Sequence, residues 1–127
     1  MNHITSPNAA DDTIEAAIVA KGKTAPRITP TDIEAAIAGE FSFTVGNAAR
    51  ALNCPVSEAV DLLTICVLTL KNGFTVTGES ACASPENFDA QIGYRIAREN
   101  AKQKVWPLLG YLLKENLSKS EPDTAAP

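Results

Sequence analysis

The middle of the chain carries runs of β-branched and other apolar residues, and apolar residues recur at helical spacing on either side of these runs. Two runs rich in β-branched residues, 64–70 and 74–77, meet at Lys71-Asn72-Gly73. Asn-Gly between two such runs is a strong signal for a type I′ turn, which joins antiparallel strands. The sequence therefore predicts a β-hairpin with strands at about 64–70 and 74–80.

A two-residue turn would also fix which side chains share a face of this hairpin. A ribbon of two strands is only marginally stable alone. One apolar face is expected to pack on the helix that follows, and the other on the N-terminal helices or on another subunit, which favours an oligomer. The first predicted face carries Ile65, Val67, Thr69, Phe74, Val76 and Gly78, and the second carries Cys66, Leu68, Leu70, Thr75, Thr77 and Glu79.

A long C-terminal helix is predicted from Pro85 to about Leu117, where apolar residues recur at helical spacing. Ser84 can cap its first turn, and Pro85 fits the first helical position, which has no intrahelical bond to lose. Pro107 lacks an N–H and clashes with the preceding turn, so a kink is expected near Pro107, at residues 103–106.

Two short helices are predicted before the hairpin, because the word Ile-Glu-Ala-Ala-Ile occurs at residues 14–18 and 33–37. The first should stop at Lys21-Gly22, whereas the second should begin at Thr29-Pro30 and end at Gly39. The fold class is therefore α+β. We expect residues 1–12 to be a disordered tail, 13–117 a single domain and 118–127 a flexible tail.

The segment between the second helix and the hairpin resembles a helix-turn-helix, with an Ala-rich helix at Val45, a break, and a helix capped near Ser57. A DNA-binding regulator would place the second helix in the major groove. That helix offers Glu58 and Asp61 and no base-reading side chain, so two packing helices are the alternative.

The 127 residues are 45% hydrophobic and carry a net charge of −4, which argues against a protein that coats nucleic acid. The sequence shows neither a membrane span nor a signal peptide. Its cysteines, Cys54, Cys66 and Cys82, are expected to be reduced core residues, and no metal site or cofactor is expected. Since His3 is the single histidine and no nucleophile has a recognisable base, we expect no enzymatic activity.

The candidate binding surface is a polar stripe on the long helix, where residues recur at spacings of four, three and four. Arginines there could grip a phosphate through paired N–H bonds, although a solvated face is the alternative. Phe74 could stack on a base or lie in the core, and Asn87 could bind a ligand or cap the helix. The candidate ligand-binding residues are Arg95, Arg98, Phe74, Asn87 and Lys102, and Gln91 completes the stripe.

Several segments together resemble a family of small tailed-phage proteins that includes the first-described type of Thoeris anti-defence protein. The matching residues are 25–30, 70–81, 84–89, Gly93, 96–101 and 106–108. The resemblance implies a non-enzymatic protein of the host cell cytoplasm that sequesters cyclic ADP-ribose isomers or cyclic oligonucleotides of bacterial immunity. It also implies a dimer or higher assembly, with a hexamer built from dimers as one form. A protein-binding inhibitor that adds a strand of a host partner to the hairpin edge is a further alternative.

Overall fold

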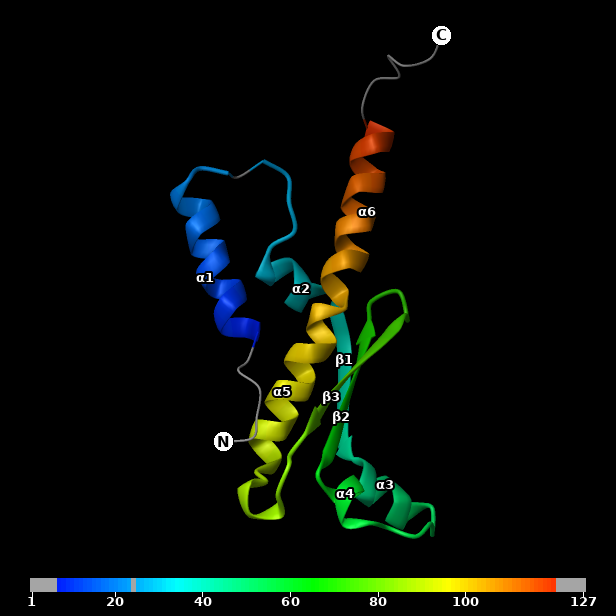
Figure 1. The fold of residues 1–127 in the computed structure, drawn as a ribbon. Helices are drawn as coiled ribbons and strands as arrows, with labels where there is room; N and C mark the ends of the chain where they lie inside the picture. Colours follow the sequence, from blue (N-terminus) through cyan, green and yellow to red (C-terminus); the bar gives the residue numbers. More distant parts are fainter. Residues whose placement is uncertain (1–6, 24, 121–127) are drawn as a thin grey trace.

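The computed structural model describes residues 7–23 and 25–120, with side chains from residue 11 onward. The chain is α+β, as predicted, and its elements are shown in Figure 1. In chain order they are α1 (Pro7–Ala20), α2 (Pro30–Ala36), β1 (Ile37–Thr44), α3 (Val45–Ala51), α4 (Glu58–Asp61), β2 (Leu63–Leu70), β3 (Thr75–Ala81), the 3-10 turn η1 (Pro85–Asn87), α5 (Ala90–Gln103) and α6 (Val105–Ser120). Among the described residues, no helix is long and apolar enough to cross a membrane.

The strands form an antiparallel sheet in the order β1-β2-β3, so the predicted hairpin is joined by a strand that the sequence did not predict. Ile37 completes a helical word, yet the backbone becomes extended there and pairs with Leu70. Gly39 was expected to end a helix. It lies instead within β1, where the register with β2 shifts.

The hairpin turn has three residues, so the predicted type I′ turn is wrong. Leu70 N donates to Phe74 O at 2.8 Å, and Gly73 N donates to Leu70 O at 2.8 Å. A type I′ turn needs positive φ at two residues, whereas here Gly73 has φ +89° and Asn72 is not in that region. The extra loop residue shifts the register by one, which turns every side chain of β3 to the opposite face from the one predicted.

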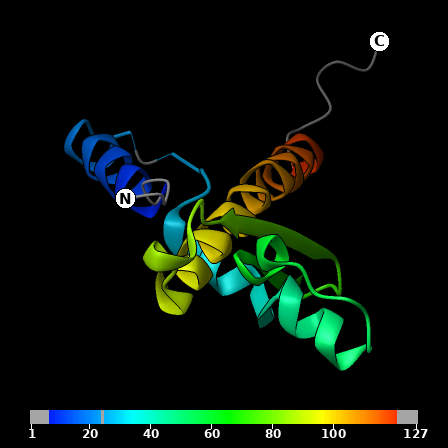
Figure 2. The same ribbon diagram turned by 60° about the horizontal axis from the view of Figure 1, so that its bottom comes forward.

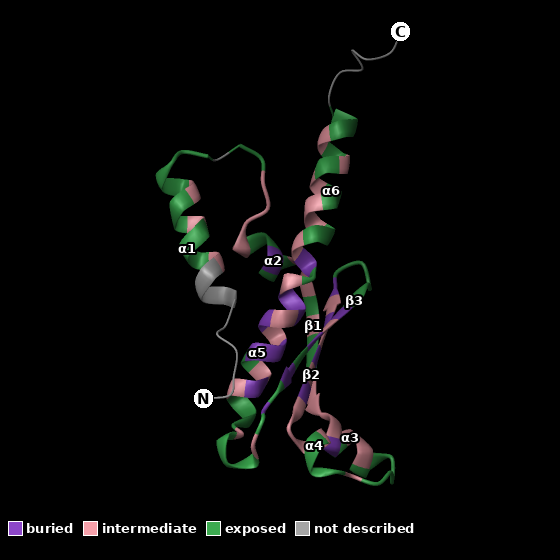
Figure 3. Cartoon of the chain, in the orientation of Figure 1, coloured by how far each residue is buried: buried purple, intermediate pink, exposed green. Residues whose placement is uncertain are grey.

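One face of the sheet is covered by α5 and the other is open. The covered face carries Leu68 opposite Val76 and Cys66 opposite Gly78, all buried. The open face carries Phe41 and Phe43 of β1 beside Val67 and Ile65 of β2, and the Phe41 side chain is 65% exposed. Figure 3 shows the buried residues gathered between α5 and the sheet. The core comprises Ile33, Cys66, Leu68, Leu70, Val76, Ala97, Ala101 and Val105.

Gly78 permits the closest approach between α5 and the sheet. A Cβ placed on Gly78 would lie 2.2 Å from Ala97 O and 2.3 Å from Ala101 N, both backbone atoms of α5. Ala97 and Ala101 are themselves fully buried. The helix therefore rests on β3 through small residues, with no space for a side chain at position 78.

The C-terminal helix is bent, as predicted, at Lys104 between α5 and α6. Pro107 is the third residue of α6, where it cannot donate to the carbonyl four residues earlier and crowds it, so the break falls before it. The predicted start at Pro85 is wrong, because residues 85–87 form a 3-10 turn. The α-helix begins at Ala90, and the Asp89 carboxylate accepts from the backbone N–H groups of Gln91 and Ile92 in its first turn.

The predicted end of α1 and the predicted start of α2 are confirmed. Thr29 forms a capping box with Asp32 at the start of α2, and α1 ends in a Schellman motif at Gly22, which has φ +67°. The predicted disordered tail is wrong for residues 7–12, which are helical; Gln103 of α5 donates to Asp11 there at 3.0 Å. Residues 118–120, which were expected to belong to a flexible tail, form the end of α6. Residues 1–6 and 121–127 lie outside the described part.

The segment that resembled a helix-turn-helix forms two short helices at the end of the sheet away from α1 and α6 (Figures 1 and 2). Arg50 of α3 binds Asp61 of α4 through two hydrogen bonds of 2.8 and 2.7 Å. Four residues of α4 span only about 6 Å, which is short for a recognition helix. The geometry favours the packing alternative. Cys54 in the loop between these helices is exposed, unlike the buried Cys66 and Cys82, and all three thiols are free.

Replacing Gly78 with alanine should destabilise the protein by about 1–3 kcal/mol or more, because the methyl group can be accommodated only by moving α5 off β3. Urea unfolding of Gly78→Ala and Gly110→Ala measures this. Gly110 lies inside α6 with open space around its Cβ position, so the control should be stabilised by about 0.5–1 kcal/mol. Equal stability of the two variants would contradict the proposed close contact.

Candidate functional site

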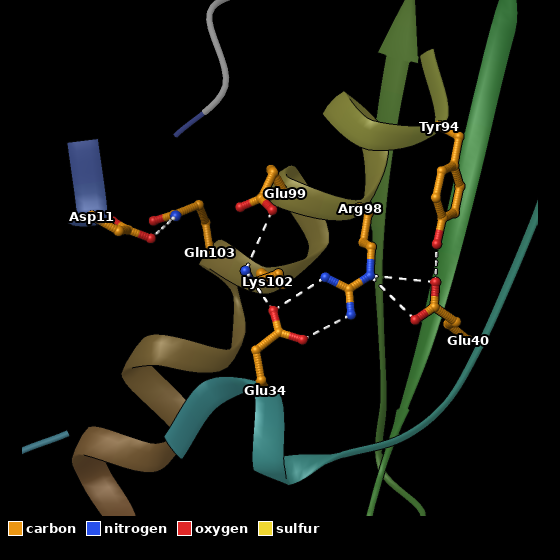
Figure 4. Close-up of polar contacts among 8 residues, drawn as sticks. All are labelled: Asp11, Glu34, Glu40, Tyr94, Arg98, Glu99, Lys102 and Gln103. Atoms are coloured by element: carbon orange, nitrogen blue, oxygen red, sulfur yellow. Dashed lines mark hydrogen bonds and ion pairs between the residues drawn. The ribbon is translucent and has the colours of Figure 1, made fainter. Parts of the chain in front are cut away.

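One face of α5 carries a cluster of charged side chains that reaches α2 and β1 (Figure 4). Tyr94, Arg98 and Lys102 follow one another at spacings of four residues, so they project from the same side of the helix. Glu34 of α2 and Glu40 of β1 face them. These residues include two members of the predicted basic stripe.

Arg98 is held by two carboxylates at once. Its Nη1 and Nη2 donate to the two oxygens of Glu34 at 3.1 and 2.9 Å, and its Nε donates to Glu40 at 3.2 and 3.3 Å. The Tyr94 hydroxyl donates to the same Glu40 carboxylate. Since the Arg98 side chain is only 19% exposed, its positive charge is satisfied inside the chain.

Lys102 is also paired within the chain. Its Nζ lies 2.6 Å from a Glu34 oxygen and 3.3 Å from Glu99, and its side chain is 7% exposed. The hydrogen bond from Arg98, and to a smaller extent the contact with Lys102, lowers the pKa of Glu34 to about 2. Glu34 therefore stays ionised at every pH near neutrality and ties α2 to α5. The same pairing raises the pKa of Arg98, chiefly through its hydrogen bond to Glu34.

A hollow of about 420 Å³ opens beside this cluster, and its charge is unfavourable for an anion. Asp12, Glu34 and Glu99 contribute three carboxylates to its lining, against two cations from Arg98 and Lys102. A phosphate entering here would have to displace Glu34 and then remain close to the other carboxylates. Arg98 and Lys102 of the predicted stripe therefore form an internal clamp with the carboxylates that face them.

A second hollow, of about 270 Å³, lies between the hairpin turn and the start of α6. It is uncharged, and its rings are accessible, since Phe74 is 55% exposed and Tyr111 is 73% exposed. Asn72 sits at the rim, where its side-chain oxygen accepts from Phe74 N at 3.0 Å. The lining residues are Leu70, Asn72, Phe74, Leu108, Leu109, Tyr111 and Leu112.

The remaining predicted site residues lie apart from this hollow. Arg95 is exposed in the first half of α5 and makes no hydrogen bond or ion pair with the described residues. Asn87 is exposed in η1 and donates to Ser84 Oγ at 3.2 Å. It does not cap the helix, because Asp89 is the N-cap of α5. Position 95 lies 13 residues before Leu108, or roughly 20 Å along the helices, so one chain does not bring Arg95 and Phe74 together.

A comparison with protein-family models matches residues 28–117 to the phage protein (N4 Gp49/phage Sf6 gene 66) family. The chain belongs to this phage protein family. The match runs from the linker before α2 to near the end of α6, so it leaves out α1. It includes the whole lining of the hollow at Phe74, and all of the lining of the charged hollow except Asp12. Neither the curated proteins nor the solved structures contain a match to the chain.

The sequence alone did not indicate that Glu34 and Glu40 belong to the charged cluster. Their partner Arg98 is 64 and 58 residues away in sequence. One signal was available, because Glu40 precedes the alternating run Phe41-Ser42-Phe43. If that run is a strand with phenylalanines on one face, Glu40 lies on the other face, which the helix covers and where a carboxylate needs a cation.

Arg98→Ala should destabilise the protein by about 2–4 kcal/mol, because it leaves two carboxylates of the cluster without their main partner. Arg95→Ala removes an exposed arginine from the same helix and should change stability by less than about 0.5 kcal/mol. Denaturant melts of both variants test this difference. If both variants lost the same stability, or if neither lost any, the result would argue against the clamp.

Proposed function

We propose that this phage protein is a non-enzymatic counter-defence protein that binds and sequesters cyclic nucleotide immune signals. The observation that carries the proposal is the uncharged aromatic hollow at Phe74 and Tyr111. Nucleobases stack on exposed aromatic rings with about 1–3 kcal/mol per base, and the amide of Asn72 adds a polar group at the rim. The motif resemblance to phage anti-defence proteins, which includes Phe74 and its flanking residues, supports the same class of ligand.

The phosphates of such a ligand need a cation, and Arg95 is the predicted stripe residue that keeps its charge available. A charge-assisted hydrogen bond from Arg95 to a phosphate would contribute about 1.5–3 kcal/mol. Because Arg95 and the hollow are far apart in one chain, a single ligand could meet both only between two copies.

Self-association is therefore part of the proposal, and the open face of the sheet is the surface we assign to it. Phe41 and Phe43 lie side by side there, with ring centroids 5.5 Å apart, next to Ile65 and Val67. Covering such a face removes apolar area from water and needs no charged partner. The assembly is a dimer or a multiple of one, and a hexamer built from dimers fits the resemblance.

A second candidate function rests on the outer edge of β1. This strand pairs with β2 on one side, so its other edge offers backbone groups to an added strand. On the opposite edge of the sheet, Asn100 of α5 already donates to Glu79 O of β3 at 2.8 Å. Inhibition of a host protein by strand addition at β1 is the alternative if no cyclic nucleotide binds.

Ligand binding is tested by calorimetric titration with a panel of cyclic ADP-ribose isomers and cyclic di- and trinucleotides. Phe74→Ala should weaken binding by about 5- to 150-fold through lost stacking, and Arg95→Ala by about 10- to 150-fold. Leu52→Ala and Lys21→Ala are matched controls, each removing an exposed apolar or basic side chain elsewhere.

Ligand released by denaturing the complex should be chemically unchanged, since the proposal includes no turnover. If wild type binds nothing on the panel, the proposal fails in favour of a protein partner. If Phe74→Ala binds as tightly as wild type, the hollow is not the site.

Self-association is tested by sedimentation velocity at micromolar protein concentration. Wild type should sediment as a dimer or larger, whereas Phe41→Glu should sediment as a smaller species, because a carboxylate on the open face cannot be buried without a partner. Leu52→Glu places the same charge on another exposed apolar position and should leave the assembly intact. A monomeric wild type would remove this part of the proposal.

A further inference from the structure

α1 lies against the body of the protein without contributing a buried residue. Among residues 11–20, whose side chains the structure describes, none is buried, and Ile14 and Val19 are 58% and 55% exposed. Figure 3 shows the described part of α1 in the colours of exposed and intermediate residues, beside the buried face of α5. An isolated helix of this length is only marginally stable in water, so α1 needs its docking contacts.

The surface beneath α1 is incompletely filled. A hollow of about 220 Å³ remains between Ile14 and Ile18 of α1 and Ile28 and Trp106 of the body. Side chains that line such a gap lose dispersion contacts. In addition, Trp106 Nε1 is buried and has no hydrogen-bond partner among the described residues, a state that costs free energy in the docked form.

Polar contacts of Glu15 and Asp11 tie α1 to the rest of the chain. Arg27 donates to both oxygens of Glu15 at 2.6 and 2.9 Å, and Gln103 donates to Asp11 at 3.0 Å. Arg27 belongs to the link between α1 and α2, whose described residues, 21–23 and 25–29, form no helix or strand. Such a link allows α1 to move without disturbing the capped start of α2.

We propose that α1 is a displaceable strap, fastened by the Arg27–Glu15 pair, which opens in the native protein and uncovers the apolar hollow at Trp106. On the body of the protein, the opened surface is lined by Ile28, Pro30, Gln103 and Trp106. It is therefore suited to a mainly apolar group. This device is independent of the nucleotide site, because the hollow at Phe74 is lined by other residues.

Trp106 is the single tryptophan of the chain, so quenching of its fluorescence by acrylamide reports on the strap directly. Arg27→Ala should raise the quenching constant by about twofold or more, and salt should raise that of wild type, since ions screen the partly exposed pair. Arg50→Ala is the matched control, because it removes a bidentate ion pair to Asp61 at the far end of the sheet. Identical quenching in the two variants would overturn the proposal.

Hydrogen exchange of the wild-type protein provides a second readout that does not depend on any variant. Amides of residues 11–20 should exchange at least about tenfold faster than those of α5, because opening the strap does not require global unfolding. Equal protection of the two helices would overturn the proposal. So would quenching that changes with protein concentration, because α1 would then dock on a neighbouring copy.

Discussion

The contact between Gly78 and the backbone of α5 sets the geometry on which the rest of the structure depends. With α5 seated directly on β3, its buried alanines face the sheet and its charged side turns toward β1 and α2. Arg98 can then reach Glu40 on the covered face of β1 and Glu34 on α2 with one guanidinium group. A bulkier residue at position 78 would lift the helix, and these short charge-assisted bonds depend on distance.

The charged cluster shows how a basic helix face can be structural in an acidic protein. On the sequence alone, Arg98 and Lys102 form a stripe that is typical of an anion site. In the fold, Glu34 accepts three hydrogen bonds or ion pairs from them, much as a bound phosphate oxygen would. The chain thus supplies its own anion, and the exposed Arg95 remains the stripe residue available to a ligand.

Local signals in the sequence were sufficient for the hairpin strands, the α2 cap and the break before Pro107, because each depends on neighbouring residues. The strand β1 was missed because Ile37 belongs equally to a helical word and to a β run, and pairing with Leu70 decides between them. The face assignment failed because Asn-Gly fits both two- and three-residue loops. The ion pairs of Arg98 could not be predicted, since they join segments far apart in sequence.

Two separate apolar surfaces remain on the folded chain, and together they constrain how it works. A twofold contact through the open sheet face, around Phe41, is self-complementary and closes on itself. It does not cover the hollow at Phe74 and Tyr111, which lies at the junction of the hairpin turn and α6. In the proposed function, that second surface takes the ligand. An assembly that used the open sheet face for dimerisation would keep the hollow free for it.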